Sequence, residues 1–419
     1  MGWSEKRGNT WRARFKLPDG TYGSQPGFRT KDQADAHWQA QETDVRRGDW
    51  FDPKAGDEIL FSQWAKQWLA GLDLAPDSEY AYHKRIRARL DPRWGDYPLS
   101  HITTSAYLEW EKATRQALSK RYAAQILQLF RMIMDDAVTH QPPYLKASPV
   151  PIKNRRRGRH QPPPADEVSE LSVQQVIAMA ENARVVWGLT GYVFILVKAF
   201  CGLRQGEMYG LRREWCYPYW PESDAGWPGN PAGKAAEKKR QKAVRARYGD
   251  MPALRVQWQH QYVRPEGGGK RVPELVLPKY HSVRNLVLPP FLAELLVELL
   301  NSHDSEWVFP SMGGKGSLLL TDFSTYYWKP MLDGAEERTG RYARPAIEAV
   351  EGLEDAVPHW LRHCMKAWLD EDGHHPRVAV EERMGHRLQG VEGVYSRTTV
   401  AMERRIAEAL QERWEKARS

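Results

Sequence analysis

The sequence predicts a mainly α-helical chain with small β elements, an α+β fold class, divided into three parts. Three observations lead to this prediction. Apolar residues recur at helical spacing in residues 51–160 and again after residue 165. The apolar and polar alternation that is typical of strands is confined to the first thirty residues and to residues 254–289. A stretch rich in proline and arginine, residues 149–164, cannot bury a core and marks a domain boundary.

The first fifty residues predict a small sheet backed by one helix. In residues 10–17, apolar side chains alternate with basic ones, so the basic ones share one face of a strand. A Pro-Asp-Gly turn leads to a second strand over residues 21–28, and Thr30 is placed to cap a helix that ends near Gly48. The basic residues of the first strand are Arg12, Arg14 and Lys16. Their face fits a DNA major groove, but it also fits a solvated sheet surface.

Residues 51–160 predict a bundle of four helices, with Asp77 as the cap of the second and a third that starts near Thr103. The expected apolar stripes are Phe61, Trp64, Trp68 and Leu69; Tyr80, Ile86 and Leu90; Tyr107, Leu108 and Trp110; and Ala123, Ile126, Leu127, Phe130, Ile133 and Met134. The second helix also carries a dense group of cations, namely His83, Lys84, Arg85, Arg87 and Arg89. This density exceeds that of an ordinary solvated face and indicates contact with phosphates.

Composition narrows the class of protein. The chain has 419 residues, of which 41% are hydrophobic, so two or three domains with cores are expected. A formal net charge of +8 favours a polyanionic partner without choosing among DNA, RNA and a membrane surface. The three cysteines lack the spacing of a zinc site, and neither a membrane span nor a secretion signal is evident. A soluble, cytoplasmic protein is the resulting expectation.

The stretch from Pro358 to Arg397 carries candidate chemistry. His359 and Arg362 are three residues apart, so on a helix they share one face and can hold a tetrahedral anion together. His386 follows, and Tyr395 offers a phenol that becomes a nucleophile once its proton is removed or its oxyanion is stabilised. Taken singly, each piece has a commoner structural explanation, such as a surface pair, a capping residue or a packed tyrosine.

A second candidate residue follows a buried helix. The largely apolar residues 186–200 lead into the sequence Gly-Leu-Arg-Gln-Gly-Glu, in which Arg204 lies three residues before Glu207. We expect the surroundings to orient this arginine. A turn with a surface Arg–Glu pair, which would be worth little, gives the same pattern.

Three further features of the sequence could contact a ligand or a partner. Strands over residues 254–263 and 273–289, joined by three glycines, place Lys279 near a hairpin tip, where its ammonium can reach a ligand, although a plain hairpin-tip lysine is commoner. Residues 217–252 form a surface insertion with a basic end, a possible DNA contact. A final helix over residues 400–414 has an apolar stripe suited to a partner surface.

In this order the motifs resemble those of the tyrosine recombinase, or phage integrase, family, and the resemblance covers essentially the whole chain. The residues that carry it are Arg204 in Gly-Leu-Arg-x-Gly-Glu, Lys279 in Pro-Lys-x-x-x-Ser-x-Arg, His359 and Arg362 in His-x-Leu-Arg-His, His386 in Gly-His, and Tyr395 in Tyr-Ser. The chain departs from the family pattern at Arg397, where many relatives have histidine, and in the length of its insertion.

The resemblance implies three domains of a heterobivalent integrase. Residues 1–50 would be an arm-type DNA-binding domain with a three-stranded sheet and a helix, and residues 57–150 a helical core-binding domain of the SAM-like type. Residues 151–165 would be a basic linker, and residues 166–419 the mixed α/β catalytic domain. DNA contacts are then expected from Arg12, Arg14, Lys16, Lys84, Arg85, Arg87, Arg155, Arg156 and Arg157.

The resemblance also implies a reaction that uses neither a metal nor another cofactor. Tyr395 would attack a phosphodiester and form a 3′-phosphotyrosine, while Arg204 and Arg362 stabilise the charge on the phosphate. The remaining implied roles are protonation of the departing 5′ oxygen by Lys279, proton transfer at the tyrosine by His359, hydrogen bonding to the phosphate by His386, and support of Arg204 by Glu207.

The implied partner is double-stranded DNA with attachment sites, on which the protein would assemble as a tetramer. A host DNA-bending protein and a directionality factor are possible further partners, and no membrane is expected. A resolvase or a type IB-like topoisomerase would use the same chemistry, and a non-catalytic DNA-binding regulator is the alternative from another class. The presence of all six reactive residues argues against the regulator, and the arm-like N-terminal region favours an integrase.

Overall fold

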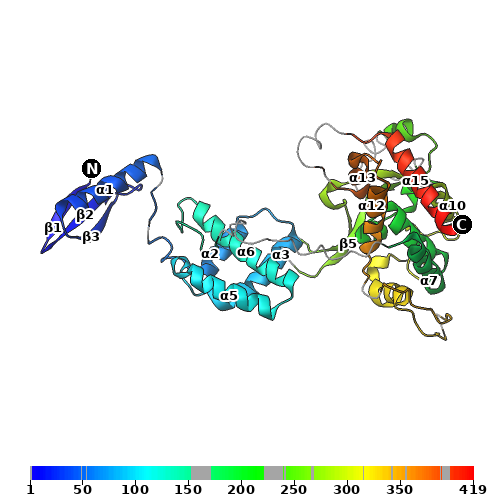
Figure 1. Cartoon of the computed structure of the whole chain (residues 1–419), viewed down its shortest axis with the longest axis horizontal. Coiled ribbons are helices and arrows are strands. Elements are labelled where there is room, and N and C mark those ends of the chain that lie inside the picture. The colour runs from blue at the N-terminus through cyan, green and yellow to red at the C-terminus, as the bar shows by residue number, and fades with distance from the viewer. Residues whose placement is uncertain are drawn as a thin grey trace. The chain divides into compact units, whose positions relative to one another are not determined.

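The computed structural model divides the chain into two compact units, Met1–His160 and Gln161–Ser419 (Figure 1). The structure describes residues 2–48, 50–52, 54–151, 171–220, 239, 242–265, 269–314, 316–340, 343–353, 356–386, 388 and 397–419. The linker prediction for residues 151–165 falls almost entirely outside these ranges, as do Arg155, Arg156 and Arg157.

The N-terminal region is a three-stranded antiparallel sheet backed by one helix. Its strands are β1 (Trp3–Arg7), β2 (Thr10–Lys16) and β3 (Tyr22–Phe28), in the order β1-β2-β3. The helix is α1 (Lys31–Arg47). Its caps are the predicted ones, because Thr30 accepts a hydrogen bond from the Gln33 backbone N–H and Gly48 is left-handed with φ of 78°. The sheet and helix are confirmed, and β1 is the strand that no apolar alternation indicated.

The open face of this sheet is basic but not purely so. Glu5 of β1 lies opposite Arg12 in register, at 3.4 Å from the Arg12 guanidinium and 3.7 Å from that of Arg14. The ring of Trp3 packs edge-on against that of Tyr22, and both rings remain more than 40% exposed. Arginine, an acid and two aromatic rings therefore share one accessible surface.

The rest of the first unit is the expected helical bundle. Its helices are α2 (Phe61–Ala70), α3 (Pro76–Arg85) continuing through a π-helical turn (Ile86–Leu90) into α4 (Asp91–Trp94), a short 3-10 turn (Leu99–His101), α5 (Thr104–Ala117) and α6 (Lys120–Thr139). The predicted stripe of α6 is buried throughout, and the Phe130 ring of α6 packs against those of Trp94 and Tyr107.

Three details of the bundle prediction are wrong. Ala75, rather than Asp77, caps α3, because Pro76 takes the first helical position, where a missing N–H costs nothing. Tyr80 and Leu108 are 46% exposed, since each lies at the edge of its stripe and faces solvent. The predicted start of α5 near Thr103 is confirmed, and Thr103 is its cap.

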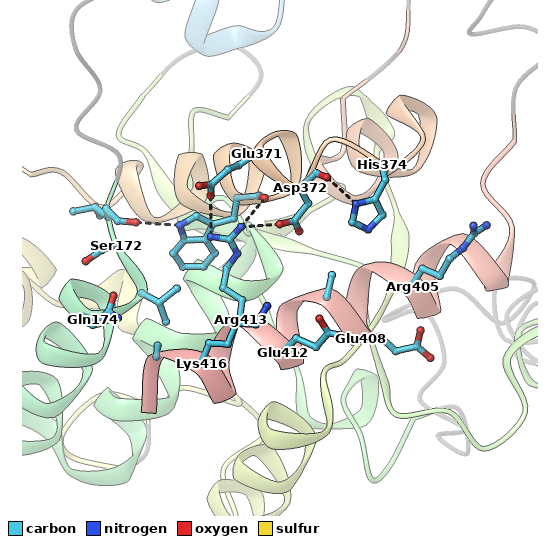
Figure 2. A pocket seen from close by; sticks show the side chains of 15 residues that line it. Ser172, Gln174, Glu371, Asp372, His374, Arg405, Glu408, Glu412, Arg413 and Lys416 are labelled. Atoms are coloured by element: carbon cyan, nitrogen blue, oxygen red, sulfur yellow. Dashed lines mark hydrogen bonds and ion pairs between the residues drawn. The ribbon is translucent and has the colours of Figure 1, made fainter. Parts of the chain in front are cut away.

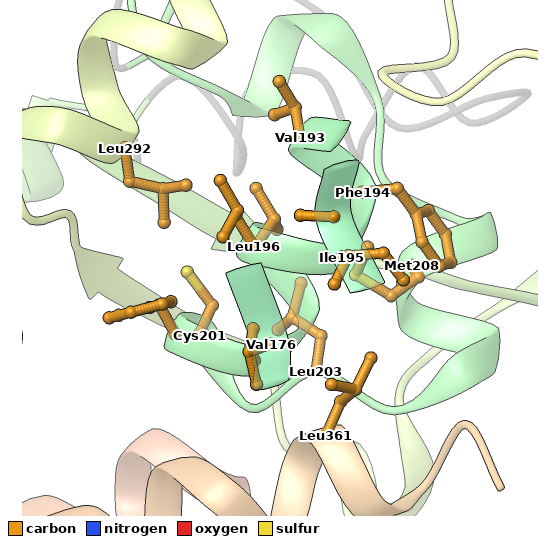
Figure 3. Close-up of a cluster of buried hydrophobic side chains, with 14 of the residues drawn as sticks. Val176, Val193, Phe194, Ile195, Leu196, Cys201, Leu203, Met208, Leu292 and Leu361 are labelled. Carbon is orange, nitrogen blue, oxygen red and sulfur yellow. The ribbon is translucent and has the colours of Figure 1, made fainter. Parts of the chain in front are cut away.

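The second unit is organised around α7 (Val173–Cys201), which begins at a Ser172 cap and kinks at Gly188. From Val193 to Cys201 every residue is fully buried, and Figure 3 shows neighbouring apolar side chains gathered around this half of the helix. By length and composition α7 could cross a membrane, but 72% of its most apolar window is buried inside the protein. It is the core helix of this unit.

Two separate two-stranded sheets lie beside α7's C-terminal end. Strand β4 (Ala253–Val256) pairs with β7 (Arg284–Val287), and β5 (Gln259–Val263) pairs with β6 (Val272–Val276), both antiparallel. Lys279 therefore does not lie near a hairpin tip. It begins a short turn (Lys279–His281) that carries the chain from one sheet to the other, because the polar break divides the predicted second strand between two partners.

The remaining helices enclose this core. They are α8 (Gln205–Tyr209), the 3-10 turns Arg213–Trp215 and Leu318–Leu320, α10 (Pro290–Asn301), the π-helical turn Ser324–Trp328, α11 (Lys329–Leu332), α12 (Trp360–Asp372), α13 (Arg377–Met384) and α15 (Val400–Arg418). The expectation that the stripe of α15 serves a partner is wrong. Ile406, Leu410 and Trp414 pack into the chain's own core, with the Trp414 ring stacked on that of Phe291 at 4.2 Å.

Part of the insertion is described at its base. Residues 242–248 are helical, and Tyr248 packs against Trp220 in a small buried cluster. The Tyr248 hydroxyl donates to Glu403 of α15 at 2.8 Å. Residues 221–238 and 240–241 lie outside the described residues.

Candidate active site

A sharp turn after α7 presents Arg204. Gly202 ends the helix with φ of 63°, and a Cβ there would lie 2.7 Å from Met365, so glycine suits both the conformation and the space. Arg204 then starts α8. Its Nη1 donates to Glu207 at 2.8 Å and to the Ser282 hydroxyl at 3.3 Å, and its Nη2 donates to the Gly385 carbonyl at 2.8 Å.

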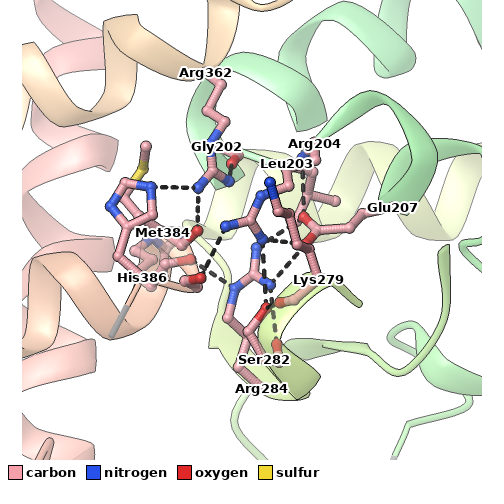
Figure 4. Close-up of polar contacts among 12 residues, drawn as sticks. Gly202, Leu203, Arg204, Glu207, Lys279, Ser282, Arg284, Arg362, Met384 and His386 are labelled. Carbon is pink, nitrogen blue, oxygen red and sulfur yellow. Dashed lines mark hydrogen bonds and ion pairs between the residues drawn. The ribbon is translucent and has the colours of Figure 1, made fainter. Parts of the chain in front are cut away.

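Glu207 is the buried anion of the cluster. Its two carboxylate oxygens accept from Arg284 at 3.1 and 2.9 Å, and one also accepts from the Arg204 backbone N–H at 2.9 Å (Figure 4). Burial alone would raise the pKa of Glu207, but the charge and hydrogen bonds of Arg284 and Arg204 outweigh burial and lower it to about 2. Glu207 is therefore ionised at neutral pH and fixes both arginines.

Arg362 comes from α12 and is 2% exposed. It donates to the carbonyls of Gly202 and Met384, and its Nη2 lies 3.0 Å from Nε2 of His386. Burial, reinforced by the Arg204 charge, lowers the pKa of Arg362 to about 9, so it remains charged at neutral pH. Arg204 and Arg362 thus bind the adjacent carbonyls of Gly385 and Met384.

His386 lies between Arg362 and Glu381, whose carboxylate is 2.6 Å from its Nδ1. Because a guanidinium can only donate, Nε2 of His386 accepts from Arg362 and Nδ1 donates to Glu381. Glu381 also pairs with Lys366 of α12 at 3.3 Å. The imidazole orientation is therefore set from both sides.

His359 and Lys279, like His386, are exposed. His359 immediately precedes α12 and packs edge-on against His363 at 4.7 Å. Partial burial, together with the charges of His363 and Arg362, lowers the pKa of His359 to about 4. The carbonyl of Lys279 accepts from the Ser282 hydroxyl at 2.8 Å, and that hydroxyl also accepts from Arg204.

The turn that begins at Lys279 has an unusual backbone. Tyr280 and His281, which follow it, have φ of 61° and 54°. Left-handed conformations are uncommon in residues other than glycine and gather at functional sites.

Comparisons with known proteins bear on the sequence and the fold of the chain. No protein-family model matches the chain. Two phage integrases, from Mycobacterium phages FRAT1 and D29, are each 26% identical to it over 166 residues. That match covers 38% of this chain and 44% and 39% of the two integrases, so the chain spans less than half the length of the curated relatives it matches.

Solved structures extend the comparison to most of the chain. The integrase of transposon Tn1549, in complex with a circular intermediate DNA, superposes with a TM-score of 0.53 at 15% identity, over 84% of this chain and all of that one. Its complex with transposon right end DNA gives a TM-score of 0.51 at 15% identity, over 84% of this chain and 99% of that one.

The chain has the tyrosine recombinase fold. Within it, the structure brings together Arg204, Glu207, Arg362 and His386 from three separate segments (Figure 4). The alternative of a surface Arg–Glu pair is wrong, because the Glu207 side chain is fully buried. Tyr395, the nucleophile expected from the sequence, lies outside the described residues.

Sequence reasoning missed four charged residues of this cluster. Arg284 was quoted within a motif without a role, and Lys198, Glu381 and Arg383 were not singled out, although all four contact the site or its supports. The sequence signal that could have identified Arg284 was its place at the end of the Pro-Lys-x-x-x-Ser-x-Arg motif, two residues after Ser282. A lysine inside a long apolar run was the available signal for Lys198.

One other region, a pocket, carries no comparable arrangement. A pocket of about 740 Å³ lies between α12, α15 and the start of α7, but its Arg413 is paired with Glu371 and Asp372 at 2.9 and 2.8 Å (Figure 2). Within the described ranges, no group of three or more His, Cys, Asp or Glu residues is placed to hold a metal ion.

Proposed function

We propose that this chain is a site-specific DNA recombinase of the integrase type, which cleaves and rejoins double-stranded DNA through a 3′-phosphotyrosine. The pair of Arg204 and Arg362 carries the proposal. Each uses three N–H groups on the protein, and two on each find no acceptor among the described residues. Such preorganised donors stabilise a pentacoordinate phosphorus more than its ground state.

The proposed reaction exchanges one phosphodiester bond for another. The Tyr395 oxygen attacks phosphorus, the bond to the 5′ oxygen breaks, and the bond energy is kept in the phosphotyrosine. His359 takes the phenol proton. Its lowered pKa keeps its imidazole neutral near pH 7, and a DNA phosphate beside it would favour the protonated form. Lys279 gives a proton to the departing 5′ oxygen.

His386 completes the proposed phosphate site. Its Nε2 accepts from Arg362 when no phosphate is bound. To donate to a phosphate oxygen, Nε2 must gain a proton and release the Arg362 N–H group to the same phosphate. Glu381, bonded to Nδ1, holds the ring in place during this exchange.

The domain roles are part of the same proposal. Residues 1–50 would bind arm-type sites through the face that carries Arg12, Arg14 and Lys16, and residues 57–150 would grip core DNA through the cations of α3 and its continuation. The protein would act as a tetramer on attachment sites in the cytoplasm, with a host DNA-bending protein and a directionality factor. The Tn1549 integrase structures, which contain transposon DNA, support a DNA substrate of this kind.

The test uses a nicked duplex built from the DNA that flanks the coding region. Cleavage next to the nick releases a short oligonucleotide, so religation is prevented. We expect a protein–DNA adduct that survives a denaturing gel, with or without EDTA, and joined products when paired attachment sites are supplied. Free cleaved DNA that disappears in EDTA would instead indicate a metal-dependent nuclease. Relaxation of supercoils without site preference would indicate a topoisomerase.

A further inference from the structure

Lys198 is a fully buried lysine that the proposed reaction does not yet use. It lies in the last turn of α7, within an otherwise apolar run. Its Nζ donates to the Leu203 carbonyl at 3.1 Å, and among the described residues that carbonyl is its only hydrogen-bond partner. Lysine is almost never fully buried without a partner, so this placement calls for a reason.

The carbonyl that Lys198 holds belongs to the turn that builds the arginine cluster. In this turn the Gly202 carbonyl accepts from Arg362, the Leu203 carbonyl accepts from Lys198, and the next residue is Arg204 (Figure 4). Leu203 is itself fully buried, so without the lysine its carbonyl would lose its donor at a position closed to solvent in this structure. Removing the amino group would free the turn on which both guanidiniums depend.

The charged groups near Lys198 act on its protonation in opposite directions. Glu207 of α8 favours its ammonium form, while Arg362 of α12 opposes it, and His359 before α12 also feels its charge. Burial is the largest influence, and together these lower the pKa of Lys198 to about 7. An incoming phosphodiester adds a negative charge between Arg204 and Arg362. This charge favours the ammonium form of Lys198.

We propose that Lys198 is a positioning residue of the phosphate site, which holds the Leu203 carbonyl and gains a proton when a DNA phosphate binds. This inference rests on the proposed function. The amino group fixes the turn between α7 and α8 in either protonation state. The added proton supplies a positive charge behind Arg362 while the phosphate is in place.

Two substitutions separate the hydrogen bond from the charge. Lys198→Met removes both and leaves the Leu203 carbonyl without a donor. Lys198→Gln keeps a neutral N–H donor of similar reach. Lys329→Gln, at an exposed position on α11 of the same unit, is the matched control. Circular dichroism and thermal unfolding show whether each variant is folded.

Adduct formation on the nicked duplex is measured from pH 6 to pH 8. We expect Lys198→Met to be slower by about 10- to 100-fold at every pH, as for a lost buried hydrogen bond to a charged group. Lys198→Gln should fall behind the wild type by about tenfold at the low end of this range, where the bound lysine is charged, and the gap should narrow as rising pH removes that charge.

Binding gives a second readout that does not depend on cleavage. Calorimetry with the same duplex, in buffers of different ionisation enthalpy, measures proton uptake at pH 7.5. The full chain should take up more protons than its Lys198→Gln variant. Equal uptake with a constant rate ratio across the pH range would overturn the charge role, and a wild-type rate in Lys198→Met would overturn the positioning role. An inactive wild type would overturn the proposed function instead.

Discussion

Arg284 and Glu207 form a doubly hydrogen-bonded ion pair inside the second unit, with Nη1–Oε1 and Nη2–Oε2 distances of 3.1 and 2.9 Å. Both side chains are at most 3% exposed. The Arg284 Nε also donates to the Arg383 carbonyl at 2.8 Å, so the pair ties β7 to α13 as well as to α8. The orientation of Arg204 depends on this pair, because the same carboxylate binds Arg204.

We predict that Glu207→Gln destabilises the protein by about 3–5 kcal/mol, because it leaves the buried Arg284 charge unpaired. Urea unfolding followed by tryptophan fluorescence measures the loss. The matched control is Glu371→Gln, whose carboxylate is 70% exposed and pairs with Arg413. That change should cost about 0–1 kcal/mol. Similar small losses in both variants would show that the buried pair is not a structural support.

The same carboxylate predicts a pH dependence of stability. The pKa of Glu207 is about 2 in the folded protein, against an ordinary value of 4.5. A lowered folded pKa stabilises the protein fully above pH 4.5, and this contribution is lost as pH falls from 4.5 toward 2. Unfolding midpoints between pH 5 and pH 2.5 should fall more steeply in the wild type than in Glu207→Gln. Parallel curves would assign the acid sensitivity to other groups.

Arg362→Lys should reduce cleavage by about 100- to 1,000-fold while core DNA affinity changes little. One ammonium cannot bond the Gly202 and Met384 carbonyls and still present a planar pair of donors to a phosphate. Arg405→Lys, an exposed change on α15, is the control. Gel shifts and adduct yields on the nicked duplex measure both properties. Near-normal cleavage by Arg362→Lys would remove this arginine from the site.

The sheet at the N-terminus supports a separate prediction. Changing Arg12, Arg14 and Lys16 together to alanine should leave cleavage of an isolated core site intact but prevent integration between full attachment sites. The salt dependence of binding to full sites should weaken by a slope of about 0.9 for each lost phosphate contact. Footprinting and a recombination assay on the same protein test this. Unchanged footprints and integration would leave this face as a solvated surface.

Local signals in the sequence were sufficient for much of the fold. Thr30 caps the helix it was expected to cap, and α5 starts at Thr103 as expected, because helix starts depend on a few neighbouring residues. Lys279 was misplaced because strand pairing is a long-range choice, and β6 and β7 turned out to have different partners. The apolar stripe of α15 showed that the helix buries one face. It could not show whether the chain's own core or a partner covers that face.

The candidate site was predictable as a set of residue types and not as a geometry. Arg284 pairs with a carboxylate 77 residues away, and no spacing rule reaches that far. Lys198 sits in an apolar run, where only burial and the direction of its side chain distinguish it from a lysine that reaches solvent. The sequence alone therefore located the arginines and histidines but not the charges that hold them.

In the proposed reaction Tyr395 is the nucleophile that forms the phosphotyrosine. The most direct measurement compares wild type, Tyr395→Phe and the control Tyr326→Phe, an exposed tyrosine of the same unit, on the nicked duplex. The account predicts adducts from the wild type and Tyr326→Phe, with the DNA-linked peptide containing residue 395 by mass spectrometry. Tyr395→Phe should bind the duplex normally and form no adduct. A persistent adduct in Tyr395→Phe would contradict the account.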